Sequence, residues 1–193
     1  MKTPLSAASL VQLLHQYYPS GLWCDDPAYE ASVEAQRLTR LLDQAQKDTH
    51  LWQSFVLHVG EQLDGCTLWD TSLLWIDLCY RLRVSLPGSG SAGGPSKVLI
   101  CLVSLLAPAY VLYASHSLGT GTATELSNCY PPLPPELHPY EAQLEALIES
   151  TFEATRLPNE VLFTPVPGLA PRTGNVALGK ARLIDLLFTP DRW

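Results

Sequence analysis

The longest regular pattern of apolar residues lies between residues 33 and 63. Within this stretch apolar side chains recur every three or four residues, which is the spacing of one face of an α-helix. Polar residues such as Arg37 and Lys47 fall off that stripe. The pattern predicts a long amphipathic helix that covers a core, with a bend near Asp48–Thr49 and an end at Gly65.

Between residues 66 and 118 the pattern changes to that of β-strands. Arg81 and Arg83 alternate with apolar neighbours, which places both arginines on one face of a strand. Residues 98–118 carry no charge and are rich in Val, Ile and Tyr, which favour strands. Two buried strands that meet at Ala107–Pro108 explain this run. We therefore expect a central antiparallel sheet of three or more strands.

The remaining segments predict further helices and short strands. Residues 5–18 indicate a short amphipathic helix, and residues 139–156 indicate a second helix in the C-terminal half. The proline-rich residues 130–139 predict a stiff connector between the sheet and the second helix. Two apolar segments, 160–166 and 181–188, follow; we expect at least one to be an edge strand and the other to be a strand or a short helix. The order predicts a single α+β domain over residues 1–193, with a central antiparallel sheet packed against the long helix and the second helix.

Composition narrows the class of partner. The chain has 12 basic and 19 acidic residues and a net charge of −7, which argues against nucleic-acid binding because phosphate binding needs a basic face. A partner steered by charge would itself be basic. The five cysteines contain no C-x-x-C pair and no zinc-like spacing. We expect free thiols, a cytoplasmic protein, no metal and no cofactor.

A glycine-rich stretch has the glycine spacing of a cofactor-binding motif. Gly88, Gly90 and Gly93 form G-x-G-x-x-G after a predicted strand. A dinucleotide-binding turn needs a helix directly after the third glycine and an acidic residue about 20 positions later. Gly94, Pro95 and a strand-like run follow instead, and the next acidic residue is too far away. The stretch is better explained as a hairpin loop.

Two alternatives to a binding protein remain open. The stretch around Ser117 is similar to the nucleophile elbow of α/β hydrolases, although Ser115 stands where the elbow has glycine and only His138 lies downstream. A small hydrolase using Ser117 is one alternative. The other is a membrane-associated protein through residues 98–118, although this run reaches the necessary length of about 20 residues only by including Pro108 and polar side chains. We expect neither a catalytic set nor a membrane span.

Four glutamates stand out within the second predicted helix. Glu141, Glu145, Glu149 and Glu153 follow one another at intervals of four residues, so they line one ridge of the helix. Like charges at this spacing destabilise an isolated helix, so local stability does not explain them. They form either a solvated face or an acidic surface that binds a basic partner.

A second candidate for partner binding lies on the predicted strands. Arg81 and Arg83 share one strand face, and Trp69 and Trp75 lie nearby in the sequence. Arg and Trp are enriched where proteins bind each other. The same residues would also suit an exposed strand face above buried tryptophans.

In general character the chain resembles small acidic bacterial immunity proteins, which neutralise toxins delivered between competing cells. The likeness rests on the glutamate ridge over residues 141–153, the compact α+β pattern and the unpaired cysteines. It implies a cytosolic, non-enzymatic inhibitor that binds a toxin domain and covers its active site. A basic toxin domain would suit the acidic balance of the chain.

Overall fold

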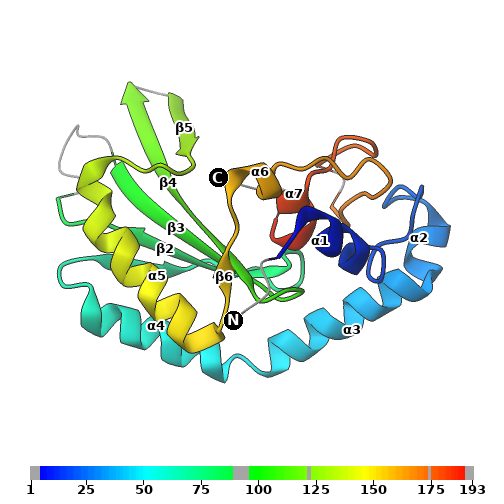
Figure 1. Ribbon diagram of the computed structural model, residues 1–193, viewed down its shortest axis with the longest axis horizontal. Coiled ribbons are helices and arrows are strands. Elements are labelled where there is room, and N and C mark those ends of the chain that lie inside the picture. Colours follow the sequence, from blue (N-terminus) through cyan, green and yellow to red (C-terminus); the bar gives the residue numbers. More distant parts are fainter. Residues whose placement is uncertain (1–4, 89–95, 121–122, 174, 190–193) are drawn as a thin grey trace.

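The computed structural model describes residues 5–88, 96–120, 123–173 and 175–189 (Figure 1). Within these ranges four helices precede a run of five strands. A fifth helix, which is long, comes next, and short helices and one further strand follow it. In chain order the elements are α1 (Ala7–Leu14), α2 (Pro27–Ala31), α3 (Val33–Lys47), α4 (His50–Gln62), β1 (Thr67–Asp70), β2 (Cys79–Ser85), β3 (Ser96–Ser104), β4 (Ala109–Thr120), β5 (Ala123–Cys129), a 3-10 turn (Pro135–Leu137), α5 (His138–Phe152), β6 (Thr155–Arg156), α6 (Asn159–Leu162) and α7 (Leu183–Leu187).

The strands form a meander in which each strand pairs with the next. The order across the sheet is β1-β2-β3-β4-β5, and all these pairs are antiparallel. The short strand β6 runs parallel to the start of β4, where Tyr110 lies opposite Arg156. Strand β1 is therefore an edge of the sheet. The expected α+β class with a central antiparallel sheet is confirmed.

The long helix expected over residues 33–63 is two helices that break at Asp48–Thr49. They cover opposite faces of the sheet. Helix α3 buries Leu38 in one cluster with Ile100 of β3, whereas α4 buries Phe55 in a second cluster with Leu99 of the same strand. Helix packing on the sheet is thus confirmed, and the expected bend is the point where the chain passes from one face to the other.

Both faces of the sheet are covered, which explains the uncharged run over residues 98–118. Helices α4 and α5 pack side by side over one face, and α1, α3 and α7 contribute to the core on the other (Figure 1). Residues of β3 that point to one face and residues that point to the other are equally buried, so no polar alternation is seen. Residues 98–118 form most of β3, a turn and most of β4. Across the described ranges, no helix is long and apolar enough to cross a membrane.

The glycine-rich stretch connects two antiparallel strands. Strand β2 ends at Ser85, and the next described element is β3, which begins at Ser96 and pairs with β2. Gly88 has a φ of 77°, a conformation that favours glycine at the start of such a loop. Gly90 and Gly93 lie outside the described residues. The interpretation as a hairpin connection is confirmed.

The C-terminal segments differ from expectation. Residues 160–166 and 181–188 each contain a short helix, and one isolated bridge between Pro165 and Arg182 joins the two segments. The expected edge strand is therefore wrong, whereas a short helix, one of the two forms expected for the other segment, is found in both. Apolar residues on all sides of α7 are buried, and Leu186 and Leu187 belong to the core on the α3 face. An all-round apolar segment of this length suits a buried helix as well as a strand, and packing decides between them.

Candidate functional site

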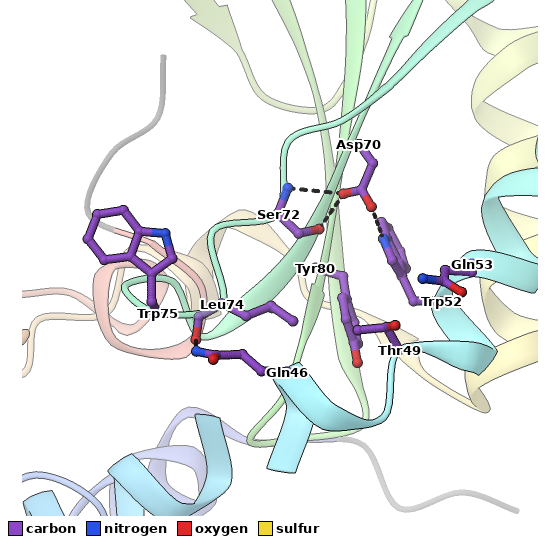
Figure 2. A pocket seen from close by; sticks show the side chains of 9 residues that line it. All are labelled: Gln46, Thr49, Trp52, Gln53, Asp70, Ser72, Leu74, Trp75 and Tyr80. Atoms are coloured by element: carbon purple, nitrogen blue, oxygen red, sulfur yellow. Dashed lines mark hydrogen bonds between the residues drawn. The ribbon is translucent and has the colours of Figure 1, made fainter. Parts of the chain in front are cut away.

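A cavity of about 360 Å³ lies beside the edge strand β1 (Figure 2). It opens between the junction of α3 with α4 and the loop that joins β1 to β2. Nine residues from these elements line it: Gln46, Thr49, Trp52, Gln53, Asp70, Ser72, Leu74, Trp75 and Tyr80. Of these nine, only Asp70 carries a charge. We call this cavity the β1 pocket.

The carboxylate of Asp70 is held in place by three neutral donors. The indole Nε1–H of Trp52 donates to Oδ2 over 2.9 Å. The backbone N–H and the hydroxyl of Ser72 both donate to Oδ1, over 3.0 and 2.6 Å. Because none of these donors is charged, they orient the carboxylate, and within the described residues no ion pair neutralises it. Figure 2 shows the group bridging Trp52 and Ser72 at the end of β1.

An aromatic stack forms one wall of the pocket. The ring of Trp52, which is only 2% exposed, stacks on Tyr80 with a centroid distance of 4.8 Å and an interplanar angle of 11°. Phe55 packs against Trp52 as well, at 5.2 Å. Burial raises the pKa of Tyr80, and its hydroxyl donates to the carbonyl of Asp48 over 3.3 Å. The wall is therefore rigid and uncharged at neutral pH.

Hydrogen bonds also fix the loop on the other side of the pocket. The side-chain amide of Gln46 on α3 donates to the carbonyl of Leu74 over 3.1 Å. The hydroxyl of Ser72 accepts the backbone N–H of Arg81 over 2.9 Å, which ties the loop to β2. These contacts hold Trp75 at the rim, where Figure 2 shows its ring on the far side of Leu74 from the Trp52–Tyr80 stack.

Both tryptophans that the sequence singled out are exposed. Trp75 is 66% exposed and Trp69 is 60% exposed. Trp69 lies in β1 directly opposite Arg83 of β2, which is half-buried, so the two side chains share one face of the sheet edge. Asp70, the next residue of β1, points to the other face, as alternation along a strand requires. The edge around β1 thus presents two large aromatic side chains and the carboxylate of Asp70, with the half-buried Arg83 beside Trp69 on the opposite face from Asp70.

Arg81 occupies a very different position from Arg83. It is 2% exposed, and its Nη2 donates to Oδ2 of Asp77 over 2.7 Å and to the hydroxyl of Thr189 over 3.0 Å. The alternation correctly placed the two arginines on one face, but the C-terminal segment covers that face at Arg81. Arg81 is an internal ion-pair residue and is left out of the contact surface that we propose.

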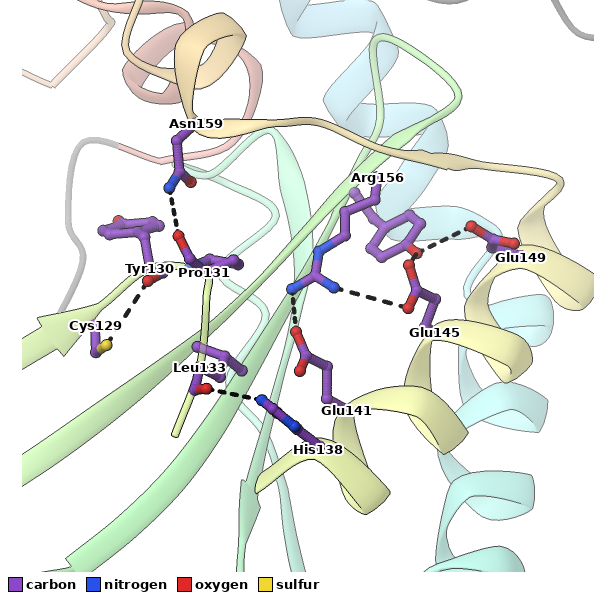
Figure 3. Close-up of polar contacts among 11 residues, drawn as sticks. Cys129, Tyr130, Pro131, Leu133, His138, Glu141, Glu145, Glu149, Arg156 and Asn159 are labelled. Atoms are coloured by element: carbon purple, nitrogen blue, oxygen red, sulfur yellow. Dashed lines mark hydrogen bonds and ion pairs between the residues drawn. The ribbon is translucent and has the colours of Figure 1, made fainter. Parts of the chain in front are cut away.

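The glutamate ridge of α5 faces the sheet (Figure 3). Arg156 of β6 forms ion pairs with Glu141 and with Glu145. The hydroxyl of Tyr110, in the neighbouring strand β4, lies 2.9 Å from Oε1 of Glu145 and 3.1 Å from Oε1 of Glu149. Tyr110 is fully buried, and burial together with these two carboxylates raises its pKa well above the ordinary value.

Glu141, Glu145 and Glu149 are therefore bound by residues of the sheet. Glu153 lies at the end of α5 with a φ of 51° and is exposed. The repulsion within the ridge is offset by Arg156 and by the Tyr110 hydroxyl. Sequence inspection did not suggest this arrangement, because Tyr110 lies 35 residues away from Glu145 along the chain.

The described residues do not form the active site that a hydrolase using Ser117 would need. Ser117 lies within β4, which continues to Thr120, whereas a nucleophile elbow sits at a strand-to-helix turn. The side chain of Ser117 itself is outside the described part of the structure. The Nε2–H of His138 donates a hydrogen bond to the carbonyl of Leu133 over 2.8 Å. Among the described residues, no group of three or more His, Cys, Asp and Glu side chains is placed to hold a metal ion.

Comparison with known proteins adds no family assignment. No protein-family model, no curated protein and no solved structure matches the chain.

Proposed function

We propose that the protein is a non-enzymatic binding module that docks a basic protein partner through the edge of the sheet around β1. In the most specific form of this proposal it is a cytoplasmic immunity protein, which covers the active site of a toxin domain. The observation that carries the proposal is the pair of exposed tryptophans, Trp69 and Trp75, on either side of the carboxylate of Asp70 along the chain.

Exposed tryptophan rings leave apolar surface in contact with water, which is unfavourable unless a partner covers it. Trp is among the residues most enriched in the energetically dominant parts of protein interfaces. Covering roughly 100 Å² of apolar surface on each ring contributes about 2–3 kcal/mol at 25 cal/mol per Å², before the cost of association. The hydrogen bonds around Ser72 and Leu74 hold the loop that carries Trp75. A rim that is already ordered loses little entropy on binding.

Charge supports a basic partner. The chain carries a net charge of −7, and the one charged residue that lines the β1 pocket is acidic. A negative field of this kind accelerates encounter with a basic domain and is screened by salt. All five cysteines are free, which suits a reducing compartment such as the cytoplasm.

The test is a capture experiment with matched surface variants. Wild-type protein and the double variant Trp69→Ala/Trp75→Ala are used as bait in lysate and with the products of neighbouring genes at low salt. Leu57→Ala is the control, because Leu57 is also an exposed large apolar residue but lies on α4. The partner that is retained by the wild type is then purified and titrated.

We expect one stoichiometric basic partner whose affinity falls at least tenfold with the double variant and is unchanged with Leu57→Ala. Higher salt should weaken the complex. Equal affinity of the wild type and the double variant would refute docking at this edge. The absence of any stoichiometric partner would refute the binding function.

A further inference from the structure

We infer that the β1 pocket is a receptor for a basic side chain, an arginine or a lysine, from a protein partner. This inference rests on the proposed function, because a protein partner supplies the side chain. It adds the chemical group that is recognised and the carboxylate that recognises it.

The carboxylate of Asp70 has no basic partner among the described residues. Its three hydrogen-bond donors are neutral, and within the described residues no Lys, Arg or His lies within ion-pair distance of it. A carboxylate offers about four acceptor positions, and three are filled. One position remains for a charged N–H, and a bond of this kind is about twice as strong as a neutral one.

The surroundings of the carboxylate also favour a cation. The ring of Tyr80 gives the pocket aromatic surface, and aromatic ring faces attract cations, whereas the ring of Trp75 lies at the rim (Figure 2). Trp52 is itself buried under Tyr80, so its role is to hold Asp70 rather than to contact the ligand. Thr49 and Gln53 add neutral hydroxyl and amide groups to the lining (Figure 2). No lining residue is basic, so nothing in the lining repels a cation.

The size and the position of the pocket also suit a single side chain. A volume of about 360 Å³ is at the small end of ligand pockets, which suits one long side chain better than a cofactor. The pocket lies beside an edge strand, with the exposed Trp75 at its rim. A basic side chain inserted here would carry its own backbone along the sheet edge, next to Trp75.

The experiment uses defined peptides and needs no knowledge of the partner. Capped Gly-Arg-Gly and Gly-Lys-Gly peptides are titrated into the full-length protein, and the indole N–H signal of Trp52 is followed by NMR because that N–H bonds to Asp70. The control peptide carries citrulline, which has the shape of arginine without the charge. Asp70→Asn is compared with Asp43→Asn, an exposed site on α3 that does not line the pocket.

We expect a saturable shift of the Trp52 signal with a basic peptide, weakening with salt, and no shift with citrulline. Asp70→Asn should weaken binding at least tenfold, and Asp43→Asn should leave it unchanged. A response to arginine alone identifies guanidinium as the ligand, and an equal response to lysine identifies a general cation site. The inference is overturned if neither basic peptide shifts the signal or if citrulline shifts it equally.

These outcomes separate the inference from the proposed function. If the Trp69/Trp75 variant loses a partner but the basic peptides fail to bind, the pocket is not the receptor and the binding module stands. If the peptides bind but no partner is retained, the cation pocket stands and the protein-binding function falls.

Discussion

Removing one hydroxyl group from the core should test the contact between α5 and the sheet. In Tyr110→Phe the ring stays in place, and the hydrogen bonds to Glu145 and Glu149 are lost. A hydrogen bond to a charged group contributes about 1.5–3 kcal/mol. Here one proton is shared between two carboxylates, and Glu149 is exposed, so we expect the low end, about 1.5 kcal/mol at pH 8.

The pH dependence of this loss is more diagnostic than its size. Burial raises the pKa of Tyr110 above its ordinary value of 10.0. Below pH 10 the hydroxyl is protonated in both the folded and the unfolded state, so its contribution to stability is fully present. Above pH 10 the unfolded state ionises first, and the contribution falls by about 1.4 kcal/mol per pH unit. The advantage of the wild type over Tyr110→Phe should therefore vanish near about pH 11.

Urea unfolding of both proteins from about pH 8 to about pH 11.5 measures this difference directly. Tyr18 and Tyr29, whose pKa values burial also raises, are present in both proteins and cancel in the comparison. Tyr140→Phe is the control, because Tyr140 lies on α5 and its hydroxyl has no hydrogen bond to a described residue. A deficit of Tyr110→Phe that stays constant across this range would refute the claim that the buried hydroxyl is held protonated.

Three further substitutions test other parts of the network. Arg81→Met should lower the free energy of unfolding by about 3–5 kcal/mol, because it removes the ion-pair partner of the buried Asp77 carboxylate. Adding Asp77→Leu should recover most of this loss, as measured by urea unfolding. Arg156→Gln should cost less, about 1–2 kcal/mol, because the ion pair with Glu141 is partly exposed, and the loss measured by urea unfolding should shrink as salt is added. Trp52→Phe keeps a stacked ring but removes the indole donor, so the free energy of unfolding should fall by about 1–2 kcal/mol in thermal unfolding. An unchanged free energy of unfolding would contradict the role of Trp52 in holding the pocket.

Local patterns predicted most elements of this fold. Helical periodicity located α3, α4 and α5, and alternation around Arg81 placed β2 with its polar residues on one face. The uncharged run over residues 98–118 predicted two buried strands that meet at Ala107–Pro108. The glycine-rich stretch was correctly identified as a hairpin connection, because the next element is a strand. These features depend on neighbours within a few residues, so they are visible in the sequence.

The candidate site depended on contacts that no local pattern records. The tryptophans were noticed in the sequence, but their exposure was not, because a tryptophan is buried or exposed according to which segments cover it. Asp70 gained its importance only when α4 brought Trp52 to it across 18 residues of chain. The C-terminal segment buried Arg81 from a distance of 108 residues.

The amino-acid sequence alone determined the class of the fold, the acidic balance and the position of the helices and central strands. The tertiary structure decided which charged and polar side chains contact one another. Four glutamates at intervals of four residues indicate a surface ridge when only the helix is considered. In the folded chain β4 and β6 place Tyr110 and Arg156 against Glu141, Glu145 and Glu149. Electrostatic energy depends on distance in space, and distance in space between remote segments is set only when the sheet and helices pack together.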